Sequence, residues 1–408
     1  MSLTSAAVVA VIALLAPLAV RLTGLRLPEI VLQIVLGILV GPQLLGWAAV
    51  DEPVRVLSVV GLAFLLLLAG LEIDFDRLRG LVLRRTSAAF VLSFVLAVAV
   101  GSILARAGLV RSPLLIAVIL SATGLGIILP VLKDAGQIAT PFGQVVVAGA
   151  SIAEVVPIVL LSVLFSADSA GIGSQLTLLG AFLGFVAVVG LLIVGFERSG
   201  RISRTLVALQ DTTAEIRIRA AIALLMTFAA LATAFGLEAI LGAFLAGATV
   251  KLLDRDQQMT HSLFRAKLQA VGFGAFVPFF FVSTGLTLDI RSLVSSPSTL
   301  ARVPIFLGAL LVVRAVPALL YAPFAARRTQ LVAAGLLQAT SLGIPIVAGA
   351  IGVDLGLIRP ANYVALIAAG LLSVVLFPLL ALPLLTVPTP DSPDLPQPAG
   401  RPTMTDPP

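Results

Sequence analysis

Apolar segments long enough to cross a lipid bilayer follow one another along almost the whole chain. A membrane-spanning helix needs about 20 mostly apolar residues. Segments of roughly this length lie at 3–20, 29–47, 53–72, 86–105, 112–132, 143–166, 176–196, 216–235, 237–253, 268–287, 303–324, 330–352 and 361–386. Because only helices and closed barrels satisfy their backbone in lipid, the sequence predicts an all-α, polytopic membrane protein with about 13 transmembrane helices.

Composition excludes several classes of protein. Of the 408 residues, 59% are hydrophobic and 11% are charged, whereas soluble chains carry about 25% charged residues. Cysteine is absent and His261 is the one histidine, which excludes disulfides, iron–sulfur clusters and histidine-rich metal sites. The net charge of +6 is spread through short loops. We therefore expect no enzyme activity, no cofactor and no nucleic-acid partner.

The basic residues predict the orientation, because Lys and Arg accumulate in cytoplasmic loops. With 13 spans and an outside N-terminus, 19 of the 26 basic residues fall inside and 6 outside, and Arg314 lies within a span. We expect a multi-pass protein of the cell (inner or plasma) membrane with its C-terminus in the cytoplasm. Residues 1–386 would form the transmembrane exchanger domain, and the Pro-rich residues 387–408 a disordered cytoplasmic tail.

Two short segments with nearly the same sequence interrupt two of the apolar runs. Residues 122–127 read ATGLGI and residues 339–344 read ATSLGI, and Pro130 and Pro345 follow them. The predicted topology makes the two copies antiparallel. Paired interruptions at matching places of two inverted halves indicate the binding site of a transporter. The sequence therefore predicts inverted repeats with two crossed broken helices, whose unwinding Gly124, Gly126 and Gly343 would permit.

Two ionisable residues lie deep in apolar runs, Glu154 and Arg314. A charge at the bilayer centre costs about 2.5 kcal/mol or more, so a functional role is the first interpretation. The alternative is a fixed buried ion pair that joins two helices without a transport role.

A carboxylate beside unwound carbonyls and the hydroxyls of Thr123 and Thr340 offers hard oxygen ligands for an alkali cation. The same carboxylate can take a proton when the cation leaves, because burial raises its pKa and a bound cation lowers it. Glu154, Thr123 and Thr340 are therefore the predicted cation and proton site, and Arg314 would compensate its charge. Weaker candidates are Ser121, Gln338 and Glu238. We expect no metal beyond the transported Na+ or K+.

Five motifs occur in an order that resembles the cation:proton antiporter superfamily, specifically its Kef-like and sodium/proton exchanger branch. They are Leu36–Pro42 (LGILVGP), Gly61–Asp74 (ending AGLEID), Ser121–Thr123 with Leu129–Asp134 (LPVLKD), Leu241–Gly247 (LGAFLAG) and Phe279–Asp289 (FFFVSTGLTLD). The resemblance implies an NhaA/NapA-like fold with a core and a dimerisation domain, an elevator-like motion and a homodimer.

One departure from the family pattern concerns the acidic pair of the core helix. The matching residues are Ala153 and Glu154, so one carboxylate remains. Arg314 stands where relatives often have Lys. The chain has no GxGxxG after a strand pattern, and we expect no nucleotide-binding regulatory domain within it.

These observations predict a secondary-active antiporter that exchanges a monovalent cation (Na+ or K+) for a proton in a lipid bilayer. With one carboxylate, exchange would be 1:1 and electroneutral. Three alternatives remain open at this point: an ungated cation efflux pathway, a scaffold that has lost transport with the first acid, and an exporter of organic cations.

Overall fold

The computed structural model describes residues 3–23, 29–72, 80–165, 172–197, 215–253, 262–288, 290–291 and 297–385. Within these residues the chain is helical and has no strand. Nine helices are long and apolar enough to cross a membrane, and four shorter apolar ones accompany them in the described residues. The predicted all-α polytopic fold is confirmed. The predicted tail, 387–408, lies outside the described residues.

The helices follow the predicted apolar runs closely. In chain order they are α1 (Thr4–Thr23), α2 (Glu29–Val40), α3 (Glu52–Glu72), α4 (Gly80–Arg106), α5 (Pro113–Ser121), α6 (Leu125–Asp134), α7 (Pro141–Leu164), α8 (Ile172–Glu197), α10 (Ile216–Ala234), α11 (Ala239–Leu253), α12 (Ser262–Val271), the π-helix η1 (Gly272–Phe276), α13 (Val277–Thr287), α15 (Pro297–Leu300), α16 (Arg302–Ala315), the 3-10 helix η2 (Pro317–Phe324), α17 (Arg328–Gln338), α18 (Gly343–Asp354) and α19 (Pro360–Leu385).

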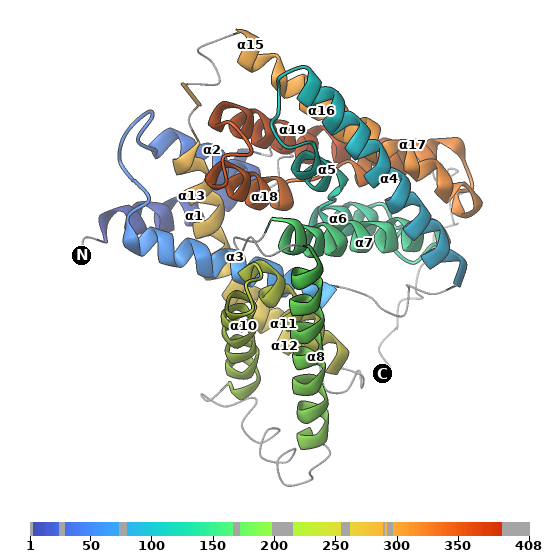
Figure 1. Cartoon of the computed structure of the whole chain (residues 1–408). Coiled ribbons are helices and arrows are strands. Elements are labelled where there is room, and N and C mark those ends of the chain that lie inside the picture. Colours follow the sequence, from blue (N-terminus) through green and yellow to red (C-terminus); the bar gives the residue numbers. More distant parts are fainter. Residues whose placement is uncertain are drawn as a thin grey trace, which may run out of the picture.

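The helices pack as two groups (Figure 1). One group holds α1 to α3 with α10 to α13, and the other holds α4 to α7 with α16 to α19. The groups meet where α7 contacts α11 and where α19 contacts α2, and α8 packs on both α7 and α11. α7 and α19 hold corresponding places in the chain, since each follows an interrupted helix, as an inverted repeat requires.

Pairs of glycines bring the helices of the first group close together. A Cβ atom at Gly37 of α2 would lie 2.3 Å from the carbonyl oxygen of Val282 in α13. One at Gly247 of α11 would lie 2.0 Å from the carbonyl oxygen of Leu67 in α3. Small residues allow such backbone contact between membrane helices. The α2–α13 and α3–α11 pairs therefore both pack with backbone against backbone at a glycine.

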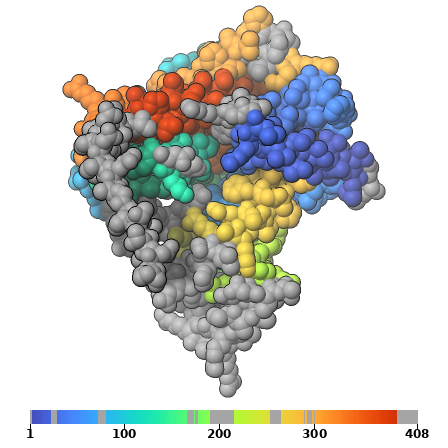
Figure 2. Space-filling model, turned by 180° about the vertical axis from the view of Figure 1, so that it is seen from behind, coloured from blue at the N-terminus to red at the C-terminus, as the bar shows by residue number. Residues whose placement is uncertain are grey.

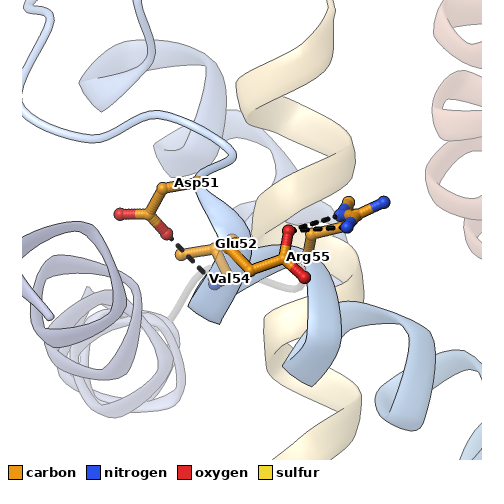
Figure 3. A network of polar contacts seen from close by, with 4 residues as sticks. All are labelled: Asp51, Glu52, Val54 and Arg55. Carbon is orange, nitrogen blue, oxygen red and sulfur yellow. Dashed lines mark hydrogen bonds and ion pairs between the residues drawn. The ribbon is translucent and has the colours of Figure 1, made fainter. Parts of the chain in front are cut away.

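The start of α3 is fixed by side chains at its first turn (Figure 3). Asp51 accepts a hydrogen bond from the N–H of Val54 at 3.1 Å, as an N-cap residue does. Glu52 and Arg55, one turn apart, form an ion pair at 2.5 Å. This polar turn marks where the apolar part of α3 begins.

Apolar side chains also cover much of the outer surface. On α1 the exposed ones include Leu14, Leu18 and Leu22, and on α4 they include Val95 and Ile103. Seen from behind, the first helices (blue) lie beside the segment around α13 (yellow) (Figure 2). An apolar exterior around a packed interior suits a protein whose surroundings are lipid.

Candidate functional site

Both predicted helix breaks are present. α5 ends at Ser121 and α6 begins at Leu125, and the chain between them is extended, with φ −79° and ψ 153° at Ala122. α17 ends at Gln338 and α18 begins at Gly343. The four intervening residues of the second break, 339–342, include Leu342 at φ −136° and ψ −48°. Helix ends inside a membrane protein leave carbonyl and N–H groups that need other partners.

The two broken helices cross and bond to each other at the breaks. The N–H of Gly124 donates to the carbonyl of Thr340 at 2.8 Å. The hydroxyl of Thr123 donates to the carbonyl of Gln338 at 2.6 Å. Segments more than 200 residues apart in the chain thus complete each other's hydrogen bonding. The crossing is therefore a direct backbone junction between the two halves.

The glycines near the breaks do not have the role that the sequence suggested. Gly126 lies within α6 and Gly343 is the first residue of α18, and a Cβ atom at either would meet open space. Gly124 has φ −88°, which any residue can adopt. The expectation that these glycines supply special backbone conformations is therefore wrong. The prolines also lie beyond the breaks, with Pro130 inside α6 and Pro345 in the first turn of α18, where proline is tolerated.

Glu154 lies beside the crossing because its helix, α7, bonds to the first break. The N–H of Thr123 donates to the carbonyl of Ala153 at 3.1 Å. The neighbours of Glu154 one turn away on α7, Ala150 and Ile158, are fully buried, yet Glu154 itself is partly exposed. An otherwise buried helix face is thus open at its one carboxylate.

Arg314, from α16, is 3% exposed and lies against the same junction. Its Nε donates to the hydroxyl of Thr123 at 2.9 Å and to the carbonyl of Gln338 at 3.3 Å. Its Nη2 donates to Oε1 of Gln338 at 2.6 Å, and its Nη1 donates to the hydroxyl of Ser93 in α4 at 3.0 Å. These acceptors are all neutral, so the position of the guanidinium is explained without an ion pair to Glu154.

Gln338 and Ser93 hold Arg314 in a continuous polar network. The Nε2 of Gln338 donates to the carbonyl of Val146 in α7 at 2.8 Å. The hydroxyl of Ser93 donates to the carbonyl of Val313 at 2.9 Å. Sequence reasoning missed Ser93, because a single serine in an apolar run carries no signal of its own. A satisfied buried network of this kind fixes the geometry of a site.

Tyr321 is a second residue that the sequence did not indicate. It lies in η2, is 2% exposed and sits against Gly149 of α7. A Cβ atom at Gly149 would lie 2.0 Å from the Tyr321 hydroxyl oxygen and 3.0 Å from Nε2 of Gln338. Gly149 therefore leaves the space into which Tyr321 and Gln338 pack.

The remaining sequence candidates differ in position. Ser121 and Thr340 are buried at the crossing, but their hydroxyls donate to the helix on their N-terminal side, that of Ser121 to the Val118 carbonyl at 2.9 Å and that of Thr340 to the Leu336 carbonyl at 3.3 Å. Thr340 takes part in the crossing through its carbonyl, which accepts the hydrogen bond from the N–H of Gly124. Glu238 lies between α10 and α11, in the other helix group, and burial raises the pKa of its carboxyl group.

The junction thus combines one partly exposed carboxylate, one buried guanidinium and several neutral oxygens. Among the residues that the structure describes, no group of three His, Cys, Asp or Glu side chains could hold a metal ion. Carboxylate, hydroxyl and carbonyl oxygens are hard ligands of the kind that bind hard cations.

Known proteins are similar to this chain in sequence and in fold. Residues 10–386 match the family described as "Sodium/hydrogen exchanger, transmembrane". YjbQ of Bacillus subtilis (strain 168) is 30% identical over 393 residues, which are 93% of this chain and 62% of YjbQ. The Na(+)/H(+)-K(+) antiporter GerN of Bacillus cereus is 25% identical over 364 residues, 86% of this chain and 88% of GerN.

The structure of the sodium proton antiporter MjNhaP1 from Methanocaldococcus jannaschii has a TM-score of 0.67 at 18% identity, over 93% of this chain and 98% of that one. This similarity establishes the fold, and the match over residues 10–386 establishes the family. This chain belongs to the sodium/hydrogen exchanger family of transmembrane proteins.

Proposed function

We propose that this chain is a secondary-active antiporter that exchanges a monovalent cation, Na+ or K+, for a proton at Glu154. One observation carries the proposal: the bond from Thr123 N–H to the Ala153 carbonyl places Glu154 at the crossing of two broken helices. Broken helices at the repeat interface are where transporters of this architecture bind their ions. The names of GerN and MjNhaP1 agree with this function.

The exchange follows from one carboxylate with two ligands. Ionised Glu154, with the carbonyl oxygens of the breaks and the hydroxyl of Thr123, binds the dehydrated cation. A proton that reaches Glu154 neutralises it, and the cation leaves. Because the cation and the proton are both positive and use the same carboxylate, the binding of each opposes the binding of the other.

The stoichiometry follows from Ala153 and Arg314. Ala153 cannot titrate, and an arginine stays protonated throughout the physiological range. One positive charge therefore binds in either direction of the cycle. Exchange is 1:1 and electroneutral, and it is insensitive to the membrane potential.

The motion that exposes the site to each side uses the two helix groups. We assign α4 to α7 with α16 to α19 as the moving core, and the other group as the static part that forms a homodimer. The supporting observation is that the groups meet through few helix pairs, α7 on α11 and α19 on α2, besides α8. From the basic loops we infer that the N-terminus lies outside the cell membrane and the C-terminus in the cytoplasm.

The test is proton flux in proteoliposomes that contain the full chain, driven by gradients of Na+, K+ or Li+. We expect flux that is equal at zero and at large negative potential. Moving one net charge would add about 2.3 kcal/mol per 100 mV and would be easily measured. Glu154→Gln should abolish flux, while Glu52→Gln, which alters an exposed ion pair on α3, should not.

Three results would count against the proposal. A flux that follows voltage without coupling to a cation gradient would indicate a channel-like pathway. Transport by the Glu154→Gln protein would show that the cation and proton bind elsewhere. Inactive wild-type protein that is folded and inserted would indicate that replacement of the first acid by Ala153 has removed transport.

A further inference from the structure

The loop between α2 and α3, residues 41–51, has an ordered backbone held by its own hydrogen bonds. The N–H groups of Trp47 and Ala48 both donate to the carbonyl of Val40, the last residue of α2, at 3.0 and 3.1 Å. Gly46 has φ 67°, a left-handed conformation that favours glycine and that turns the chain back toward the helix. The loop therefore has a defined conformation, and its side chains have fixed directions.

The loop is attached to the ends of two membrane spans. The N–H of Ala49 donates to the hydroxyl of Ser5, near the start of α1, at 3.3 Å. Ala48 is buried in an apolar cluster with residues of α1 and α3. The candidate spans Thr4–Leu22 and Glu52–Leu71 both begin beside the loop. Because the ends of membrane spans lie at the membrane–water interface, the loop lies at that level.

The outer side chains of the loop form an apolar patch, which consists of Leu44, Leu45, Trp47 and Val50. Trp47 is 64% exposed, and the other three are exposed as well. The patch continues on α3 into Val56, which is also exposed. Because the loop backbone is fixed by its hydrogen bonds, these side chains stay on the surface. A contiguous exposed apolar patch marks an interaction surface.

Charged residues border the apolar patch. Asp51, Glu52 and Arg55 follow it directly and form the polar first turn of α3 (Figure 3). The side chains of Glu52 and Arg55 are more than half exposed, as charged groups in contact with water are. Tryptophan has an apolar ring with one polar N–H group, and it is enriched where lipid meets water. The one tryptophan of the chain, Trp47, lies at this boundary.

We propose that the apolar patch is a lipid-docking surface that inserts into the interfacial region of the bilayer, with Trp47 at the level of the lipid headgroups. Lipid is the occupant that fits, because the patch is continuous with the exposed apolar side of α3 and ends at charged residues. The inference goes beyond the proposed exchange and does not depend on which ion the chain carries.

The experiment uses the fluorescence of the full chain without any substitution, since Trp47 is its one tryptophan. The protein is reconstituted in phosphatidylcholine vesicles whose acyl chains carry bromine, a quencher, either near the headgroup or near the chain end. We expect emission at shorter wavelength than that of N-acetyltryptophanamide in water. Bromine near the headgroup should quench Trp47 more than bromine near the chain end. Acrylamide in the water should quench Trp47 less than it quenches N-acetyltryptophanamide.

A variant with the tryptophan moved deeper is the matched control. Trp47→Phe combined with Leu14→Trp places the one tryptophan on the exposed side of α1. Residue 14 lies ten residues into α1, about 15 Å along the helix from its start. In this variant, bromine near the chain end should quench more than bromine near the headgroup.

Three results would overturn the proposal. Quenching of Trp47 by acrylamide as strong as that of N-acetyltryptophanamide, without an effect of bromine, would show that the loop lies in water. Weak quenching by both bromine and acrylamide would show that protein covers the patch, such as a second copy of this chain. Stronger quenching by bromine near the chain end would show that the loop lies within the hydrocarbon core.

Discussion

The contact between Gly149 and Tyr321 gives a sharp test of the site geometry. Changing Gly149 to Ala would place a methyl group 2.0 Å from the Tyr321 hydroxyl oxygen and 2.9 Å from its Cζ atom. Tyr321 is 2% exposed, so its ring cannot move into open space. Overpacking of this kind costs about 1–3 kcal/mol, and the better helix propensity of Ala returns about 0.5–1 kcal/mol.

The overpacking in Gly149→Ala should disturb the transport site as well as lower the stability of the protein. The same methyl group would lie 3.0 Å from Nε2 of Gln338, whose Oε1 accepts from Arg314. We therefore expect Gly149→Ala to lower the unfolding free energy by about 1–2 kcal/mol and to raise the KM for the cation. Thermal unfolding in detergent and proteoliposome flux measure the two effects.

A second substitution makes the test specific. Tyr321→Phe removes the oxygen atom that the methyl group would meet, so the double variant should recover much of the stability lost in Gly149→Ala. A double-mutant cycle isolates this coupling. Gly308→Ala in α16 is the matched control, since a Cβ atom there meets open space. If Gly149→Ala is as stable as Gly308→Ala, or if Tyr321→Phe gives no recovery, the packing described here is wrong.

Two further predictions concern charged residues. Arg314→Lys keeps the charge, but a single ammonium group replaces the guanidinium that bonds to Thr123, Ser93 and Gln338. The unfolding free energy should fall by about 1–3 kcal/mol, while exchange should stay independent of voltage. A voltage-dependent flux would contradict the role of Arg314 as a constant charge. Burial raises the pKa of Glu238 in the folded protein. The neutral carboxyl group therefore contributes its whole stabilisation below the pKa of the unfolded state, and this stabilisation is lost as the pH rises through the raised pKa of the folded state. Glu238→Gln should therefore reduce the fall in melting temperature between acidic and neutral pH, and an unchanged fall would contradict the burial of this carboxyl group.

Much of the fold could be predicted from the sequence, because each membrane helix is a local property of a run of residues. The breaks at 122–124 and 339–342 were predictable for a related reason: two similar sequences in antiparallel spans rarely arise without a shared structure. The role of the glycines near the breaks could not be predicted. Gly126 and Gly343 are common small residues of membrane helices, and nothing local distinguishes a flexible glycine from one that lies within a helix.

The partners of Arg314 could not be predicted either. Its hydrogen bonds join α16 to Ser93, more than 200 residues earlier, and to both breaks. A single sequence contains no record of which of its many serines meets which charge. The buried ionisable residues therefore indicated where the site is, and the structure adds the neutral groups that hold it.

Proton release on cation binding shows whether cation and proton compete for one carboxylate. Purified protein in weakly buffered detergent solution, titrated with Na+ or K+ near the pH where half the sites are protonated, should release protons in step with binding. Extrapolated to full protonation, the ratio should be one proton per cation, since the proposed site offers Glu154 alone for exchange. Glu154→Gln should bind weakly and release none. Cation binding without proton release, or release that persists in Glu154→Gln, would show that cation and proton do not compete at Glu154.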